Sequence, residues 1–275
     1  MGLIRSASVW AFGPRRARSL RAYHVDMSRS LAFAATSALL AFAAAPARAL
    51  CKPTMMDIDG RFCIDQYEAE LLEVRPTGLV PWSPYYVPLA SSTYRAVNGR
   101  GRIPQGYISG AQAQAACVNA GKRLCNSTEW MKACQGPTNM TFPYGKTYKP
   151  QSCNEHGHDP KHVGPLQRLS KGKIEYNMKT MNDPRINQLD DSVAPSGSYE
   201  DCASPYGVYD LVGNLHEWIV DTTAKGTGVF KGGYFNDADK NGPGCSYTTT
   251  AHEFTYHDYS TGFRCCSDPI SAPAF

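Results

Sequence analysis

The chain has 275 residues, with 28 basic and 24 acidic side chains and a formal charge of +4 at pH 7. Seven arginines and one acidic residue lie in the first 49 positions, so the remaining chain has 21 basic and 23 acidic residues and a charge of −2. The excess of basic residues lies in the N-terminal segment. The remaining chain is therefore not expected to bind nucleic acid or an anionic membrane surface. Its length, about 226 residues, is enough for one domain with a hydrophobic core.

The N-terminal segment has the order of a secretory signal peptide. Met27 and Arg29 precede an apolar, Ala-rich run over residues 31–45, and Ala47-Arg-Ala49 forms an A-x-A cleavage site. The alternative is a membrane anchor, but the run is shorter than the ~20 residues that a spanning helix needs. We therefore expect a leader over residues 1–49, a single domain over residues 50–275 without a transmembrane span, and export to the periplasm or the cell exterior. Both Met1 and Met27 remain open as the start codon.

All cysteines follow the expected leader. The ten positions are 51, 63, 117, 125, 134, 153, 202, 245, 265 and 266. An even number of cysteines in an exported chain indicates disulfides before metal or redox chemistry. The spacings contain no paired C-x-x-C motif of the kind that binds zinc.

The first half of the mature chain predicts one edge strand and two helices. Apolar and polar residues alternate around Phe62–Tyr67 after a turn at Asp59-Gly60, which favours a strand. Residues 75–106 are rich in Pro, Gly, Ser and Tyr and are expected to be irregular. A helix is predicted from Ser109 to Gly121, and a second is expected to open at the capping residue Ser127 and end by Gly136-Pro137.

The second half is expected to contain little regular structure. Residues 137–205 form a long polar connection, and connections of this length are usually functional or held by other means, such as calcium and disulfides. Short strands are predicted around residues 207–212, 216–220, 228–235 and 261–266.

A dense motif runs from Tyr206 to Trp218. Its residues Asp210, Gly213, Leu215 and Glu217 are spaced so that two carboxylates and two backbone carbonyls can converge on a hard cation such as calcium. The alternative is a solvated turn followed by a half-buried strand, and residue types alone favour this simpler interpretation.

Several motifs occur in the order found in one family. They are Ala120-Gly-Lys-Arg-Leu124, Thr128-Glu-Trp130, Phe142-Pro-Tyr-Gly145, Gly207 to Trp218, Lys231-Gly-Gly233 and Gly262-Phe-Arg264. From about residue 54 to its end, the chain resembles the formylglycine-generating enzyme, or sulfatase-modifying-factor, family. The resemblance implies an α+β, C-type-lectin-like fold with two main helices, short antiparallel strands and little other regular structure. It also implies a groove for an extended peptide or a small molecule.

The same resemblance implies structural calcium at Asp210, Gly213, Leu215 and Glu217. A second calcium site of the family corresponds to Asn154 and Glu155, with Asp190 or Asp191 completing it less directly because residues 160–188 look inserted.

The resemblance also implies two disulfides, Cys117–Cys265 and Cys134–Cys245. The other six cysteines are assigned by proximity along the chain and by pairing of chain regions, as Cys51–Cys63, Cys125–Cys266 and Cys153–Cys202.

The chain departs from the family where the enzymes carry their reactive thiols. Formylglycine-generating enzymes oxidise a substrate cysteine with a copper-binding cysteine pair just after the Gly-Gly motif, and Cu(I) prefers such thiolates. Residues 234–244 contain no cysteine, and Cys245 is assigned to a structural disulfide. Copper-dependent formylglycine formation is therefore not expected, and copper or iron has no support beyond the histidines.

His216 stands where the family has Trp. With His252 and His257 it offers imidazoles that are ligands for Fe, Cu or Zn when neutral. The simpler interpretation, in which His252 and His257 bond loop backbone, is favoured, and the run from His156 to His162 is interpreted as a solvated loop. The groove candidates are His216, Tyr234, His252, His257, Ser260 and Arg264.

Two functions follow, and whether the chain is an enzyme stays open. One is an oxidoreductase or maturation factor that acts on a peptide or small metabolite without the cysteine pair. The other is a non-catalytic, calcium-stabilised module that binds a peptide, glycan or envelope component, with Trp82, Tyr85 and Tyr86 as stacking rings. Simple packing is the alternative for those rings. No Gly-x-Ser-x-Gly, phosphate loop or His-Glu-x-x-His motif is present.

Overall fold

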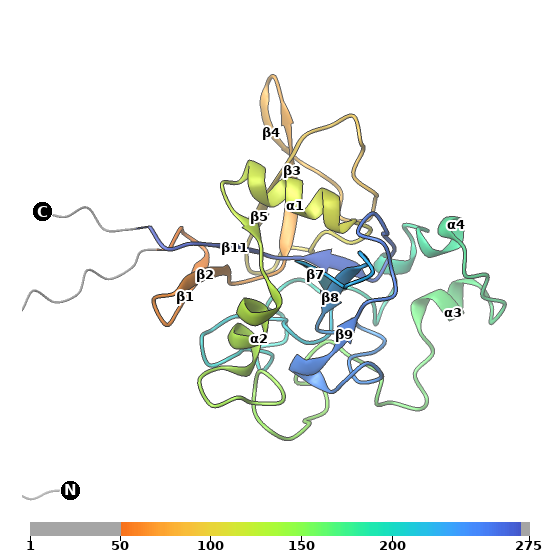
Figure 1. Cartoon of the computed structure of the whole chain (residues 1–275). Coiled ribbons are helices and arrows are strands. Elements are labelled where there is room, and N and C mark those ends of the chain that lie inside the picture. Colours follow the sequence, from red (N-terminus) through yellow and green to blue (C-terminus); the bar gives the residue numbers. More distant parts are fainter. Residues whose placement is uncertain (1–50, 271–275) are drawn as a thin grey trace, which may run out of the picture. The chain divides into compact units, whose positions relative to one another are not determined.

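The computed structural model describes residues 51–270 and contains three small sheets (Figure 1). The expected leader and the A-x-A site lie outside the described residues. The first sheet has the order β1-β2-β11-β6 and is antiparallel. Its strands are β1 (Met55–Ile58), β2 (Phe62–Asp65), β11 (Cys265–Ser267) and β6 (Arg123–Leu124).

The second sheet has the order β10-β7-β8-β9 and holds the predicted Trp218 strand. Its strands are β10 (Thr261–Phe263), β7 (His216–Thr222), β8 (Gly228–Lys231) and β9 (Thr248–Thr249). β10 runs parallel to β7, an exception to the antiparallel pairing expected from the sequence. The strand predicted over residues 228–235 ends at Lys231, because Gly232 and Gly233 adopt φ values of +86° and +74°.

The third sheet corrects an expectation. β3 (Ala69–Arg75) pairs with both β4 (Gly78–Pro81) and β5 (Tyr94–Asn98), so the segment 75–106 is not wholly irregular. Pro84 and Pro88 lie in the connection between β4 and β5, whereas Gly99, Gly101 and Gly106 follow β5. The predicted strand over residues 207–212 is also wrong, because Asp210 has a φ of +59° and only a single bridge, between Ala203 and Tyr209, forms there.

The two main helices form as predicted, with one change of cap. α1 (Gly110–Asn119) begins after Ser109, whose hydroxyl accepts from the Gln112 amide while the Gln112 side chain accepts from the Ser109 amide. α2 (Ser127–Gln135) is capped by Asn126 rather than by the predicted Ser127. Asn126 Oδ1 accepts from the Glu129 amide at 2.9 Å, and the Glu129 carboxylate accepts from the Asn126 amide at 3.0 Å. Ser127 is therefore the first helical residue.

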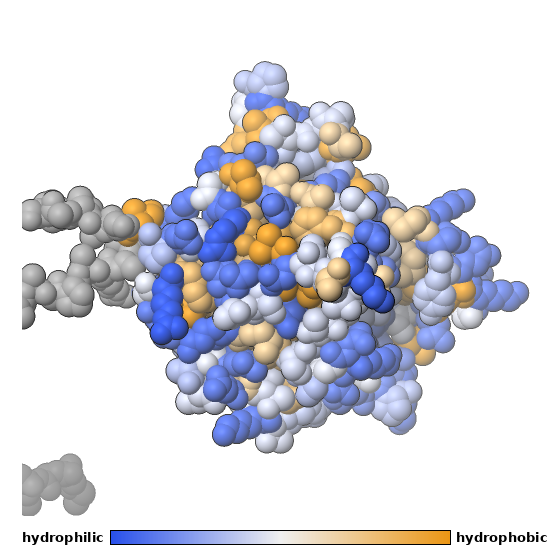
Figure 2. All heavy atoms as spheres, viewed as in Figure 1, coloured by the Kyte–Doolittle hydropathy of each residue, from blue (hydrophilic) through white to orange (hydrophobic). Residues whose placement is uncertain are grey.

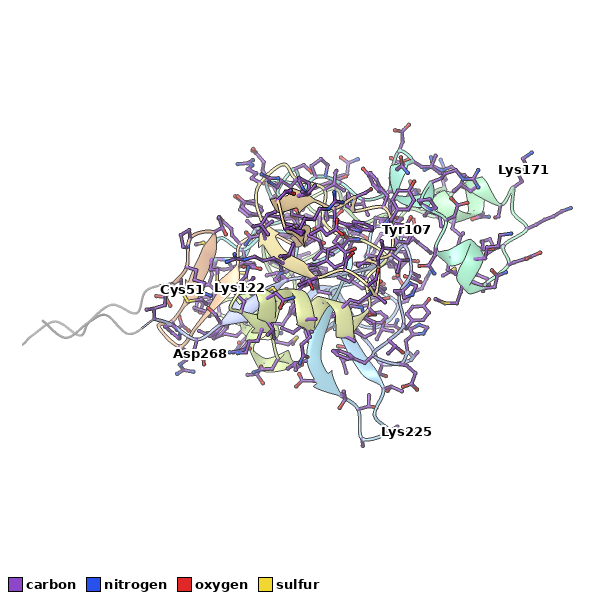
Figure 3. All side chains as sticks on the ribbon, turned by 90° about the horizontal axis from the view of Figure 1, so that it is seen from above. Cys51, Tyr107, Lys122, Lys171, Lys225 and Asp268 are labelled. Atoms are coloured by element: carbon purple, nitrogen blue, oxygen red, sulfur yellow. A yellow bond between two sulfur atoms is a disulfide. The ribbon has the colours of Figure 1, made fainter. Side chains whose placement is uncertain are left out.

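The connection 137–205 holds more structure than expected. Short helices lie at α3 (Pro165–Leu169), α4 (Met178–Met181) and a 3-10 turn, η1 (Ile186–Gln188), and a second 3-10 turn, η2 (Gly244–Ser246), lies later. In Figure 1, α3 and α4 lie beside one another on the side of the domain opposite β1. Lys171 between them and Lys225 between β7 and β8 extend outward in Figure 3, whereas Tyr107 lies inside.

All ten cysteines are paired in the five pairs named from the sequence. The pairs are Cys51–Cys63, Cys117–Cys265, Cys125–Cys266, Cys134–Cys245 and Cys153–Cys202. Three of them close loops of more than 100 residues, and in the chain-entropy model each such bridge contributes ~5 kcal/mol. These bridges replace much of the stabilisation that longer helices and strands would supply.

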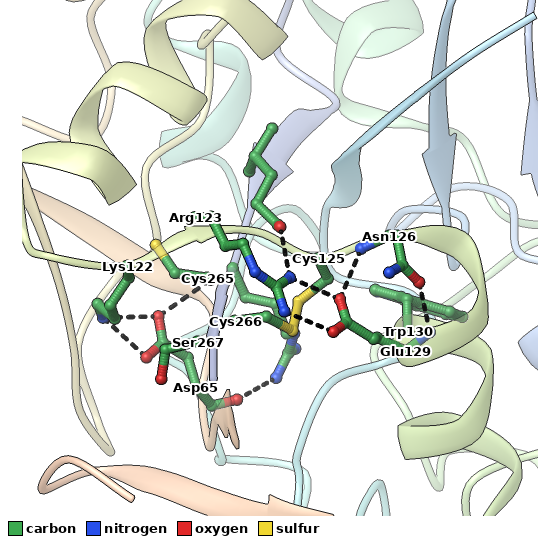
Figure 4. The surroundings of a disulfide bond; sticks show 12 residues. Asp65, Lys122, Arg123, Cys125, Asn126, Glu129, Trp130, Cys265, Cys266 and Ser267 are labelled. Atoms are coloured by element: carbon green, nitrogen blue, oxygen red, sulfur yellow. Dashed lines mark hydrogen bonds and ion pairs between the residues drawn. A yellow bond between two sulfur atoms is a disulfide. The ribbon is translucent and has the colours of Figure 1, made fainter. Parts of the chain in front are cut away.

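The core of the described residues consists of three clusters, two of which meet at β11. Cys265 packs with Cys117 and Trp218 in one cluster, and Cys266 packs with Cys125 and Trp130 in another. Figure 4 shows Cys125–Cys266 between two ion pairs, Lys122–Asp65 and Arg123–Glu129. The side chains of these adjacent β11 residues thus point to opposite faces of the sheet, because successive side chains of a β-strand alternate between its two faces.

The surface of the described residues carries both hydrophobic and hydrophilic side chains. Figure 2 shows small groups of hydrophobic residues separated by hydrophilic ones on the face in view. Across residues 51–270, no helix combines the length and apolar character needed to cross a bilayer.

Candidate functional site

A cavity of about 560 Å³ opens beside the start of β7. It is lined by strands, by the loop before β10 and by the inserted segment around α4. The lining residues are Tyr176, Asn177, Met178, Met181, His216, Phe230, Tyr234, Asp237, Asn241, Tyr247, Thr249, His252, Tyr256, Asp258, Tyr259 and Ser260. None of these described residues is Lys or Arg, and half of them carry a ring: six are Tyr or Phe and two are His.

His216 lies in the inner wall and is almost completely buried, at 5% exposure. Its ring contacts those of Phe230, Tyr234 and Tyr247, with centroids 4.6, 4.8 and 5.4 Å away. Nδ1 is buried and has no hydrogen-bond partner among the described residues. Burial, assisted by nearby His252, lowers the pKa of His216 to about 3. The imidazole is therefore neutral at physiological pH and is a weak general base.

Two buried carboxyl groups each hold a tyrosine hydroxyl of the wall. Asp258 accepts from the Tyr256 hydroxyl at 2.6 Å and from the Ser260 amide and hydroxyl at 2.8 and 2.7 Å. Asp237 accepts from the Tyr247 hydroxyl at 3.1 Å. Burial raises the pKa of Asp258, while its bonds to Tyr256 and Ser260 oppose that rise. These pairs fix the orientation of the rings that face the cavity.

Four of the six groove candidates line this cavity, namely His216, Tyr234, His252 and Ser260. His257 does not, because its Nδ1 lies 2.8 Å from Asn182 Oδ1 and its backbone carbonyl accepts from the same side chain. The His257 ring therefore bonds a side chain of the inserted segment, and not the loop backbone that the simpler interpretation expected. His252 instead stacks on Tyr256 with ring centroids 3.9 Å apart.

Arg264 is the second candidate that lies elsewhere, because its guanidinium is wholly buried against Glu217. Nε and Nη2 donate to the two Glu217 oxygens at 2.7 and 2.6 Å, and Nη2 also donates to the Tyr209 carbonyl at 2.7 Å. Trp130 Nε1 donates to the same carboxylate at 2.6 Å. Arg264 therefore organises the scaffold behind the cavity.

The inserted segment is a wall that the sequence did not place. Tyr176, Asn177, Met178 and Met181 line the cavity, and the Met181 carbonyl accepts from the Tyr259 amide at 3.0 Å. The Asn187 side chain donates to the Tyr259 carbonyl at 2.7 Å. Hydrogen bonds from the insertion thus hold both the amide and the carbonyl of Tyr259, a residue that lines the cavity.

The sequence also missed Phe230, Asp237, Tyr247, Tyr256 and Asp258 as members of this wall. The density of rings between residues 252 and 259 is a sequence signal for Tyr256, whereas Phe230, Asp237 and Tyr247 lie outside that run.

Trp82, Tyr85 and Tyr86, proposed as stacking rings for a ligand, are not among the residues that line the cavity. Trp82 packs edge-on against Tyr94, with centroids 5.2 Å apart, and its Nε1 donates to the Tyr86 carbonyl. Tyr85 packs against the cluster that holds Tyr107, and only Tyr86 is exposed, at 54%.

The predicted calcium residues of the Tyr206–Trp218 motif lie in a region with excess buried negative charge. Glu68, Asp210 and Glu217 are all buried, while Arg264 pairs with Glu217 alone. Burial raises the pKa of Asp210 to about 6, and burial with the neighbouring Asp210 and Glu217 raises that of Glu68 well above its usual range. A divalent cation fits this charge balance. Glu217 Oε1 accepts only one hydrogen bond, from Arg264, so it retains a lone pair for such an ion.

The backbone also brings the motif close to the second predicted set. The Asn214 amide donates to the Asn154 carbonyl at 2.8 Å, and the Asn154 side chain donates to the Ser192 carbonyl at 2.8 Å. A Cβ at Gly213 would lie 2.2 Å from the Asn154 carbonyl, so this approach requires glycine.

The acids of the second set are less convergent. Glu155 accepts from the Tyr148 hydroxyl at 2.5 Å and bonds His158 at 3.1 Å, while Asp190 and Asp191 are exposed. Asp191 lies 3.7 Å from Arg168. Across residues 51–270, no group of three or more His, Cys, Asp or Glu side chains is arranged to hold a metal.

The sulfatase-modifying factor enzyme 1-like domain model matches residues 87–269, which include both helices, the cavity wall and the β10–β11 region. The chain belongs to this family. The family match and the observed mixture of few helices and short strands confirm the α+β, C-type-lectin-like fold class.

Curated relatives of this sulfatase-modifying-factor chain include the mouse formylglycine-generating enzyme, 26% identical over 147 residues, which are 50% of this chain and 34% of the relative. The enzyme of Thermomonospora curvata is 28% identical over 228 residues, 70% of this chain and 67% of the relative. The cattle protein named inactive C-alpha-formylglycine-generating enzyme 2 is 26% identical over 145 residues, 49% and 40% of the two chains. The chain thus spans about a third of the length of the mouse enzyme.

Similar solved structures include PvdO from Pseudomonas aeruginosa, with a TM-score of 0.46, 15% identity and coverage of 74% of this chain and 79% of the other. The Major Tropism Determinant U1 variant has a TM-score of 0.45 and 14% identity, with coverage of 82% and 55%.

Proposed function

We propose that this family member binds an organic ligand in the aromatic cavity and does not oxidise substrate cysteines through thiols. One observation carries the proposal: every cysteine of the chain is in a disulfide, while the cavity remains open and lined by rings. Formylglycine formation by a copper-bound cysteine pair needs thiolates, and the ten cysteines supply none as long as the disulfides are intact. The relatives include both formylglycine-generating enzymes and proteins named inactive. Under this proposal the chain resembles the inactive proteins in that it does not form formylglycine.

The test is an oxidation assay on the purified, disulfide-intact protein. A cysteine-containing peptide is incubated with the protein, copper and oxygen, and aldehyde formation is followed by mass spectrometry. The expected result is no aldehyde above a protein-free control, together with no titratable thiol. Aldehyde formation that persists after alkylation of any free thiols, or that requires the protein's cysteines, contradicts the proposal.

A second candidate is a histidine-dependent oxidoreductase. The observation that favours it is the buried, neutral imidazole of His216 near His252, since neutral imidazole binds copper or iron. Metal analysis of the purified protein separates the candidates. Stoichiometric copper or iron that is lost in His216→Phe supports the oxidoreductase, whereas calcium alone supports the binding module.

We also propose that Asp210, Glu217 and the carbonyls of Gly213 and Leu215 bind structural calcium, with a second site at Asn154, Glu155 and Asp190. The excess of buried carboxylates over Arg264 supports the first site. Export through the N-terminal leader is proposed as well, since five disulfides suit an oxidising compartment.

A further inference from the structure

We propose that the cavity recognises a methylated ammonium group, carried by a small molecule or by a lipid headgroup. The inference rests on the proposed function, because it names the ligand class of the same cavity.

The rings form a continuous wall. Starting from Tyr256, the contacts run through His252 at 3.9 Å, Phe230 at 5.9 Å and His216 at 4.6 Å, with all distances between ring centroids. From His216 the wall continues to Tyr234 at 4.8 Å. Tyr234 in turn contacts Tyr259 at 5.9 Å in an edge-to-face arrangement, and Tyr247 closes the wall beside His216. Several aromatic rings around one cavity are the usual recognition element for a quaternary ammonium group, which is attracted to ring faces within about 6 Å.

The charge of the lining has the matching sign. Asp237 and Asp258 are the acidic residues of the described lining, and they are 7% and 4% exposed. Burial lowers the pKa of both His216 and His252, so neither imidazole adds positive charge at pH 7. A cation entering the cavity therefore meets rings and carboxylates, whereas an anion meets no compensating charge.

The carboxylates act mainly through the rings. Their hydrogen bonds to the Tyr247 and Tyr256 hydroxyls draw electron density toward those tyrosines and hold the two rings in place. Asp237 Oδ2 and Asp258 Oδ2 each accept one hydrogen bond from a tyrosine and retain one lone pair, so the two carboxylates offer few acceptor sites to a primary ammonium, which donates three hydrogen bonds, whereas a methylated ammonium needs fewer acceptors. This distinction selects for alkylated amines over lysine-like ones.

Tyr176 adds an outer ring from the inserted segment. It lines the cavity and is 77% exposed, so it can be replaced without disturbing the core. Tyr86 is a matched control, since it is also an exposed tyrosine, at 54%, and is not among the residues that line the cavity. The volume of about 560 Å³ lies within the range of small-molecule sites.

The test is a titration with choline and with 3,3-dimethylbutan-1-ol, its uncharged isostere, followed by calorimetry or ligand-observed NMR. We expect choline to bind the wild-type protein more tightly than the isostere. Tyr176→Ala and Tyr256→Leu are expected to weaken choline binding by about 2- to 30-fold each, whereas Tyr256→Phe retains most of it and Tyr86→Ala leaves it unchanged. Circular dichroism of each variant checks that it is folded.

The outcomes are decisive in each direction. Sedimentation with phosphatidylcholine vesicles distinguishes the sources, because binding to vesicles but not to free choline assigns the ammonium to a lipid headgroup. Equal or tighter binding of the uncharged isostere overturns the inference, as does the absence of binding to both choline and vesicles. Neither result bears on the peptide-oxidation assay, so failure of this inference and failure of the proposed function remain separable.

Discussion

The buried pair between Arg264 and Glu217 gives the sharpest stability prediction. Arg264→Met keeps the apolar stem but removes the cation and three hydrogen bonds of 2.6–2.7 Å to Glu217 and the Tyr209 carbonyl. Both side chains of the pair are at most 1% exposed, so the buried Glu217 carboxylate would lose its arginine counter-charge beside Glu68 and Asp210. The hydrogen bond from Trp130 would remain but carries no positive charge. Removing one member of such a pair is expected to lower the free energy of unfolding by about 3–5 kcal/mol.

Arg123→Met is the matched control. Arg123 also holds a carboxylate with two bonds, to Glu129 at 2.6 and 2.7 Å, but its side chain is 38% exposed. Water can solvate Glu129 after the change, so the expected cost is about 0–1 kcal/mol. Urea unfolding of both variants, with the disulfides intact and followed by fluorescence, measures the difference. Arg264→Met losing no more stability than Arg123→Met would refute the claim that burial makes this pair structural.

Three further predictions concern the cap, the cation and the cavity. Asn126→Ala should lower the free energy of unfolding by about 1 kcal/mol, because Asn126 supplies the oxygen that caps α2. Ser127→Ala should lower it by less. Equal losses for the two variants in urea unfolding would contradict the assignment of Asn126 as the cap. Chelation should lower the melting temperature of the wild-type protein and have a smaller effect on Asp210→Asn, because a ligand bound only by the native state stabilises it; an unchanged wild-type melting temperature argues against calcium. His216 has a folded pKa of about 3, below its unfolded value of 6.5, so the unfolded chain takes up the proton first and stability falls as pH drops from about 6.5 toward 3. His216→Phe should lose less stability over that window, and identical pH profiles of the two proteins would exclude a contribution from this imidazole.

The scaffold was readable from the sequence where local chemistry or an ordered motif specifies it. The Ser109 capping box and Gly121 define α1 through contacts within one turn, and the order of motifs indicated the family and two of the five cysteine pairs. The strand at β7 was also expected, around residues 216–220. These features depend on neighbours in the chain or on a pattern shared with relatives.

The cavity was readable only in part, because its wall is assembled from segments far apart in the chain. His216 was identifiable because it stands where the family has Trp, and Tyr234 because it begins the stretch in which the family's cysteine pair is missing. Tyr176 and Met181 were not, since nothing in residues 160–188 indicates that this insertion bonds to Tyr259. Arg264 was misplaced for a related reason: the Gly-Phe-Arg motif predicts its presence but not that Glu217 lies behind the cavity.

The alternation at β11 has a consequence for how the strand is held. Cys265 is bonded to α1 and Cys266 to the residue after β6, on opposite faces of one strand. A slip of one residue would exchange the two faces and place each sulfur opposite the wrong partner. The neighbouring disulfides therefore act as a covalent register lock. Reduction of both would free the strand joining the two core clusters to shift, while reduction of either one alone would leave the alignment fixed by the other.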